Sequence, residues 1–171
     1  MNGKIIVSAI ALSSLVGGAA LYYLQVYGFY EPVKEAGVDM VSVVSDRPEP
    51  LAITGFQAID ADSSPIRYRA CFTTDMSLSA LTETYVGLDA AVPRNAPDWF
   101  DCFDAAAIAS ELDAGTALPF LGQKNISFGV DRIVAITQDG RGYIWHELND
   151  CGEKAYDGTI VGEECPKRDT E

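Results

Sequence analysis

A run of twenty uncharged residues near the N-terminus, Ile5 to Leu24, constrains this chain more than any other feature. At about 1.5 Å of helical rise per residue the run is about 30 Å long, the thickness of a bilayer's hydrocarbon core. Aromatic side chains follow it, as at membrane interfaces, before Glu31 and Pro32 end the helical pattern. The pattern predicts a transmembrane helix with its interface flank over residues 1–30.

The same run also fits a cleaved signal peptide, with Lys4 as its basic start and residues 17–20 as a small-residue cleavage site. Apolar residues continue past that site, which favours a retained helix. Lys4 precedes the run and all 25 acidic residues follow it. The positive-inside tendency therefore predicts a cytoplasmic N-terminus, with the rest of the chain outside.

Three small residues of the run, Ala9, Ser13 and Gly17, are four apart and therefore share one face of the predicted helix. Such a face allows another helix to approach closely, so the expected partners are other integral membrane proteins. Small residues are also common in spans and signal peptides that have no helical partner, and this interpretation stays open beside the first.

The chain beyond the run is strongly acidic. It carries eleven basic and 25 acidic residues, a net charge of −14, while 48% of all residues are hydrophobic and can build a core. A surface this negative repels nucleic-acid phosphates and anionic lipid headgroups, and it attracts cations and basic proteins. We therefore expect no nucleic-acid partner, and a basic protein as the favoured soluble one.

The remaining pattern predicts a linker over residues 31–50, with a short strand at 37–45, followed by one domain over residues 51–171. Two hairpins and two short helices without a βαβ rhythm favour an α+β fold, with an antiparallel sheet and both helices on one face. The expected hairpins join 51–60 to 66–74 and 127–137 to 142–148. A further strand is expected at 117–121, and helices at 77–86 and 105–114 with Asp104 as N-cap.

Four cysteines follow the predicted span, at positions 71, 102, 151 and 165, and none forms a C-x-x-C pair. An even number in an exported domain predicts two disulfides, with three connectivities open. We favour Cys71–Cys102 and Cys151–Cys165, because the second closes a loop of about 15 residues, worth about 3 kcal/mol, and pins the C-terminal tail. The wide spacing and the single histidine argue against zinc, and no cofactor is expected.

The candidate interaction residues, Arg141, Tyr143, Trp145 and His146, lie in and after the turn of the second predicted hairpin. His146 is the only histidine and has the chemistry of a general base or a pH sensor, but a partly buried, hydrogen-bonded role is the plainer interpretation. Arg141 lies between two glycines and can face an anionic partner. No known catalytic pattern is present, so a non-catalytic protein is predicted.

Four stretches carry a family resemblance: FQAIDADSSPIRYRACFTT (56–74), TETYVGLDAA, NAPDWFDCFDA and DGRGYIWHELNDCG. They resemble an uncharacterised, domain-of-unknown-function family of small single-span membrane-anchored proteins of alphaproteobacteria. The resemblance implies an anchor in the bacterial inner membrane and a periplasmic domain, and it names no reaction.

The predicted function is a non-catalytic accessory subunit or assembly factor of an inner-membrane complex. The alternative is a periplasmic ligand-binding or sensory module. It requires an apolar pocket between sheet and helices, lined by Tyr143, Trp145 and His146.

Overall fold

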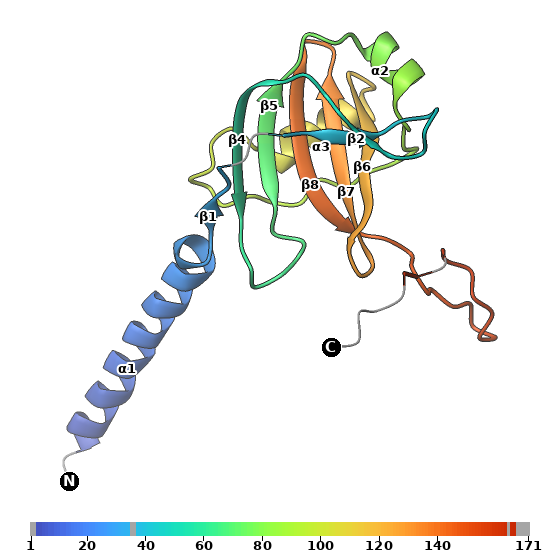
Figure 1. Ribbon diagram of the computed structural model, residues 1–171. Helices are drawn as coiled ribbons and strands as arrows, with labels where there is room; N and C mark the ends of the chain where they lie inside the picture. The colour runs from blue at the N-terminus through green and yellow to red at the C-terminus, as the bar shows by residue number, and fades with distance from the viewer. Residues whose placement is uncertain (1–2, 35–36, 164, 167–171) are drawn as a thin grey trace.

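Helix α1, Gly3–Tyr23, extends away from the rest of the chain in the computed structural model, which describes residues 3–34, 37–163 and 165–166 (Figure 1). It continues as a π-helical turn, η1, Leu24–Gly28, and no residue of either segment is buried. By length and composition this helix is able to cross a membrane. A signal sequence near the N-terminus has the same length and composition. Its apolar surface is suited to membrane anchoring.

An antiparallel sheet of six strands, in the order β1-β4-β5-β8-β7-β6, forms the centre of the domain. Both predicted hairpins are confirmed, because β4 pairs with β5 and β7 pairs with β8. A small second sheet joins β2 to β3. The strands are β1 Glu31–Pro32, β2 Asp39–Val41, β3 Pro48–Pro50, β4 Thr54–Asp60, β5 Arg69–Thr73, β6 Ala117–Ser127, β7 Val130–Thr137 and β8 Arg141–Leu148.

Both faces of the large sheet are covered, each by one helix. Helix α2, Leu78–Thr84, packs Leu81 into one apolar cluster, and helix α3, Ala105–Asp113, packs Ile108 into the other. The α+β class is therefore confirmed, but the expectation of both helices on one face is wrong. The reason lies in β5, β7 and β8, whose residues are apolar in nearly continuous runs rather than alternating, so both of their faces must be buried.

The predicted N-cap of α3, Asp104, is confirmed, and Ser77 caps the start of α2. The side chain of Ser77 accepts a hydrogen bond from the backbone N–H of Ala80, and the carboxylate of Asp104 accepts from two backbone N–H groups of α3. Gly115 follows α3 with a φ of +69°, a left-handed conformation that glycine adopts without strain.

The segment expected to be a linker belongs to the domain. β1 extends the large sheet, and β2 pairs with β3, whose two prolines occur in a short strand at the margin of the fold. Val38 and Met40 are 2% and 0% exposed and lie in the same apolar cluster as Leu81. The structured domain therefore begins at β1 rather than near residue 51.

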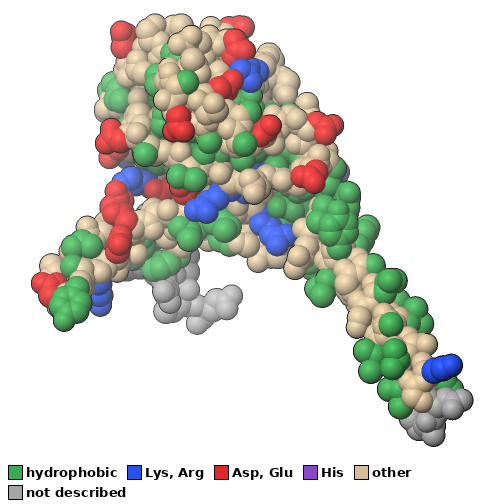
Figure 2. Space-filling model, turned by 180° about the vertical axis from the view of Figure 1, so that it is seen from behind, with side chains coloured by type: hydrophobic (Ala, Val, Ile, Leu, Met, Phe, Trp, Pro, Cys, Tyr) green, Lys and Arg blue, Asp and Glu red, His purple; other side chains and the backbone are tan. Residues whose placement is uncertain are grey.

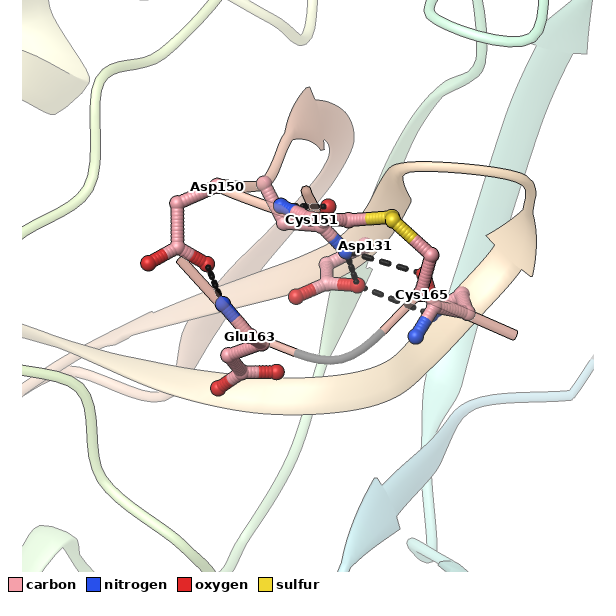
Figure 3. The surroundings of a disulfide bond; sticks show 7 residues. Asp131, Asp150, Cys151, Glu163 and Cys165 are labelled. Atoms are coloured by element: carbon pink, nitrogen blue, oxygen red, sulfur yellow. Dashed lines mark hydrogen bonds between the residues drawn. A yellow bond between two sulfur atoms is a disulfide. The ribbon is translucent and has the colours of Figure 1, made fainter. Parts of the chain in front are cut away.

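Both favoured disulfides form. Cys71–Cys102 joins the middle of β5 to the loop that precedes α3, and both cysteines lie at the apolar cluster under that helix. Cys151–Cys165 closes a loop of the C-terminal tail, where the backbone N–H of Glu163 donates to the carboxylate of Asp150 (Figure 3). The first disulfide fastens core elements, whereas the second fastens a largely exposed tail.

This difference predicts unequal effects of removing the two disulfides. Cys71→Ala with Cys102→Ala should lower the free energy of unfolding by about 3–4 kcal/mol, because an internal loop of the cooperative fold is released. Cys151→Ala with Cys165→Ala should lower it by less than about 1 kcal/mol, below the value of about 3 kcal/mol expected from loop length alone, because the tail is largely exposed and contributes little to the cooperative core. Urea unfolding of the detergent-solubilised chain, followed by tryptophan fluorescence, measures both, and equal losses would contradict the distinction.

Candidate functional site

The end of the large sheet that receives α1 is where the unusual side chains of this protein gather. β1 follows η1 almost directly and pairs with the end of β4, placing Glu31 opposite Asp60. The beginnings of β5 and β7 and the end of β8 lie at this same end, because their partners are antiparallel. In Figure 1 the connection between β4 and β5 hangs from this end, on the side toward which α1 extends.

An aromatic junction of Tyr27, Tyr30 and Trp99 joins the helix to the domain. The indole N–H of Trp99 donates to the backbone carbonyl of Val26 in η1 at 2.7 Å. The Trp99 ring stacks on Tyr27 with centroids 6.2 Å apart and meets Tyr30 edge-on at 6.0 Å. Stacking and a directional hydrogen bond together fix where the helix ends relative to the loop before α3.

Four arginines, Arg67, Arg69, Arg94 and Arg132, lie at this end of the sheet, and we call them the arginine cluster. Arg132 pairs with His146 and Arg69 with Trp145, so these two arginines lie on opposite faces of the sheet. Within the described residues, the ion pairs shorter than 4.0 Å are made by Lys124 and Arg141, so none of the four arginines has a carboxylate partner. On the face shown in Figure 2, several Lys and Arg side chains lie along the edge of the domain from which α1 extends, and most of the Asp and Glu side chains lie farther from that edge. The charge of this acidic chain is therefore unevenly distributed.

Arg69 is the buried member of the cluster, with 4% of its surface exposed. Its guanidinium donates to the backbone carbonyls of Arg94 at 2.8 Å and Asn95 at 2.9 Å, and also to two carbonyls before β5. Burial lowers the pKa of Arg69 to about 10, with the nearby charge of Arg94 adding to the shift, so it stays charged at neutral pH. Arg69 therefore binds the loop that carries Trp99 to the sheet.

Arg132 and His146 form a second buried contact. The Nε–H of Arg132 donates to Nε2 of His146 at 3.1 Å, and Nδ1 of His146 donates to the carbonyl of Pro65 at 2.6 Å. The imidazole stacks on Tyr68 with centroids 4.7 Å apart, and Arg132 lies over the same Tyr68 ring. A nitrogen that accepts from arginine carries no proton, so this geometry requires neutral histidine.

The pKa of His146 agrees with its contacts. Burial lowers it to about 4, and the charges of Arg132 and Arg69 act in the same direction. Both ring nitrogens are engaged and the residue is 4% exposed, so it is not free to act as a general base. The buried, hydrogen-bonded interpretation of His146 describes it best.

Arg67 and Arg94 are the accessible members of the cluster. Arg67 is half-buried with its guanidinium carbon 5.6 Å from the Tyr30 ring centroid, and its buried Nη1 has no hydrogen-bond partner among the described residues. Arg94 is exposed. Carboxylates occupy the neighbouring corner, where burial and the charge of Asp62 raise the pKa of Asp60.

The four residues predicted to form an interaction site do not share one surface. Arg141 binds Glu111 and Asp139, holding the pKa of Asp139 to about 2, and its Nη1 donates to the Tyr143 hydroxyl at 2.7 Å. Tyr143 and Trp145 are buried under α3, whereas His146 stacks on Tyr68, which belongs to the cluster on the opposite face. The structure brings Arg141 and Tyr143 together and separates Trp145 from His146 by the sheet.

The pocket required by the ligand-binding hypothesis is therefore absent at its predicted residues, which are packed in the core. An apolar-lined hollow of about 410 Å³ lies elsewhere, at the sheet end opposite α1, between residues 50–54 and 73–76 and beside Tyr85. None of Tyr143, Trp145 and His146 lines it.

The sequence interpretation missed the arginine cluster and Trp99. One local signal was available in IRYRA, where Arg67 and Arg69 flank a tyrosine at the start of a strand. Arg94, Trp99 and Arg132 are far away in sequence, and only the loop contacts of Arg69 and the pairing of β7 with β8 bring them near.

Comparison with known proteins identifies a family. The model of DUF6446, a family of unknown function, matches residues 38–166, a range that includes Trp99 and all four arginines of the cluster. No curated protein and no solved structure matches the chain.

The neutral state of His146 predicts a pH-dependent stability. Its folded pKa of about 4 lies below the unfolded value of about 6.5, so between these values the unfolded chain binds more protons. The free energy of unfolding should therefore fall as the pH falls from 6.5 to 4, by about 3 kcal/mol from this group.

Urea unfolding of the wild-type chain and His146→Gln at pH 7, 5.5 and 4.5 measures the effect. The variant should start less stable at pH 7 and lose less stability on acidification, while carboxylates contribute equally to both proteins. Parallel pH profiles of the two proteins would show that His146 does not carry this dependence.

Proposed function

This chain belongs to DUF6446, a family whose function is unknown, and from its own residues we propose that it is a non-catalytic accessory subunit or assembly factor of a bacterial inner-membrane complex. In this proposal α1 spans the inner membrane with the N-terminus in the cytoplasm. The acidic domain then lies in the periplasm, an oxidising compartment in which two disulfides persist.

The observation that carries the proposal is the fixed junction between helix and domain. A helix that serves only as a tether needs no defined angle to its domain, and a flexible linker is sufficient. Here β1 joins the sheet almost immediately after η1, and Trp99 holds the carbonyl of Val26. A fixed orientation is useful where the helix and the domain must contact the same membrane partner at once.

The helix face of Ala9, Ser13 and Gly17 supports a helical partner. All three residues are exposed, and a Cβ added at Gly17 would meet no atom within 4 Å. No contact among the residues that the structure describes therefore explains why the side chains of this face are small. We propose that a helix of another integral membrane protein packs there.

Two further properties fit an accessory role. The domain's net charge of −14 suits a basic periplasmic protein as a soluble partner. The best candidate for a general base, His146, is occupied by Pro65 and Arg132, which favours a structural role for this residue over catalysis.

Gentle detergent extraction from native membranes, followed by native gels and intact-mass spectrometry, tests the proposal. We expect a chain that retains residues 1–30 and migrates with a stoichiometric integral membrane protein. A mature chain that begins near residue 20 would refute the anchor, and a full-length chain that migrates alone would refute the accessory role.

The small face of α1 gives a sharper test. Ala9→Leu with Gly17→Leu should reduce the partner retained on purification by about fivefold or more, because the bulk separates two closely packed helices. The matched control, Ala11→Leu with Ala19→Leu, adds similar bulk to other faces of α1 and should retain the partner. Quantitative mass spectrometry of both preparations provides the comparison. Equal retention of the partner would mean that the small face contacts lipid, and equal losses would mean that added bulk acts on any face of α1; either result contradicts the proposed packing face.

Trp99→Phe tests the junction itself. Phenylalanine keeps an aromatic ring but cannot donate to Val26, so the angle between helix and domain should become variable. Spin labels on α1 and on the domain should report a broader distance distribution, while the free energy of unfolding changes by less than about 1 kcal/mol. An unchanged distribution would mean that β1 alone fixes the orientation.

A further inference from the structure

Two contacts define the height of the arginine cluster relative to the apolar helix. Trp99 donates to Val26 inside η1, and the guanidinium of Arg67 lies 5.6 Å from the ring of Tyr30, two residues after η1 ends. Aromatic rings at the end of a membrane span lie at the level of the lipid headgroups. If α1 spans the bilayer, as in the proposed function on which this inference rests, Arg67 lies at that level too.

The other arginines of the cluster are held near the same level. Arg69 binds the backbone carbonyl of Arg94, so the exposed Arg94 side chain emerges from the loop that leads to Trp99. Arg132 lies near the start of β7, where this strand pairs with the end of β8 at the α1 end of the sheet. Figure 2 shows basic side chains on this side of the domain, facing the direction in which α1 extends.

An external anion can be bound only at Arg67 and Arg94, because Arg69 donates to four backbone carbonyls and Arg132 donates to His146. Four arginines have no carboxylate partner within 4.0 Å among the described residues, and Nη1 of Arg67 is buried without a hydrogen-bond acceptor. The planar fork of a guanidinium suits the oxygen atoms of a phosphate group, which accept two parallel hydrogen bonds.

We propose that Arg67 and Arg94, with the buried charge of Arg69 behind them, bind phosphate groups of anionic phospholipids in the leaflet next to the domain. The domain then lies on the membrane surface through its arginine end. Glu31, Asp60 and Asp62 lie at the same end, so the contact is made by the arginine side of that end and not by all of it. The partner is a lipid headgroup because the helix that precedes the cluster delivers it to the bilayer surface.

The domain's net charge of −14 does not prevent this contact. At an ionic strength of 0.1 M the Debye length is about 10 Å, so acidic side chains on the far side of the domain are screened from the membrane. Arginines in direct contact with headgroups are screened much less. The distribution of the charge therefore decides the interaction, and the total charge contributes little to it.

Native mass spectrometry of the full-length chain in an uncharged detergent, with equal amounts of phosphatidylglycerol and phosphatidylcholine added, tests the proposal. The wild-type chain should retain phosphatidylglycerol in preference to phosphatidylcholine. Arg94→Gln should weaken phosphatidylglycerol binding about fivefold, and Arg67→Gln with Arg94→Gln about 25-fold.

Arg47→Gln is the matched control. Arg47 is also exposed and its loss changes the net charge equally, but it lies in the turn between β2 and β3, away from α1 (Figure 1). It should leave lipid binding unchanged. Circular dichroism and urea midpoints check that each variant is folded. Equal weakening by Arg47→Gln and Arg94→Gln, or equal retention of both lipids, would overturn the proposal.

Two additional arms separate other ligands of the cluster. Inorganic phosphate at the lipid's concentration should not displace phosphatidylglycerol, and displacement would make this a soluble-phosphate site instead. Loss of a co-purifying acidic protein in Arg94→Gln, with lipid binding unchanged, would assign the cluster to that protein. A chain that selects phosphatidylglycerol but purifies without a protein partner would refute the accessory function and leave this inference intact.

Discussion

The contacts of one buried cation, Arg69, hold together the parts on which the rest of the molecule depends. Its guanidinium binds the carbonyls of Arg94 and Asn95, which fastens the start of the loop before α3 to the sheet. Two residues along the same face of β5, Cys71 is bonded to Cys102 at the other end of that loop. Trp99 lies between these two attachments, and it is the residue that holds the end of the helix. Because both ends of the loop are fixed, a single indole can set the direction of α1.

This arrangement also explains why a charged group is tolerated in the interior. Burial of an unpaired arginine is costly unless its donors are satisfied. Arg69 donates to four backbone carbonyls and lies 5.8 Å from the Phe103 ring centroid, so hydrogen bonds and a cation–π contact compensate for lost water. Backbone carbonyls accept hydrogen bonds from Arg69 but carry no net charge, so they do not neutralise its positive charge.

Local sequence signals predicted the elements of this fold better than their assembly. The two hairpins and the N-cap Asp104 follow from short-range patterns and are confirmed, as are the two disulfides favoured among three open connectivities. The helix placement was wrong because it depends on both faces of the sheet being apolar. Pro48 and Pro50 indicated a linker, yet they lie in β3. In a two-stranded sheet each strand has positions whose backbone N–H makes no hydrogen bond to the neighbouring strand, and proline is tolerated there.

The functional surface was less accessible to sequence reasoning for a related reason. Apolar and aromatic residues around His146 indicated an interaction site, but in a sheet covered on both faces such residues form the core. Total charge likewise suggested repulsion from anionic lipids, although charge acts locally once screened. Helices cover the two faces of the sheet, and α1 is attached at one of its ends. In the proposed function this end therefore faces the membrane. The fold therefore determines which arginines can meet an anionic surface. Because these arginines are far apart in the sequence, local sequence patterns do not predict that they lie together.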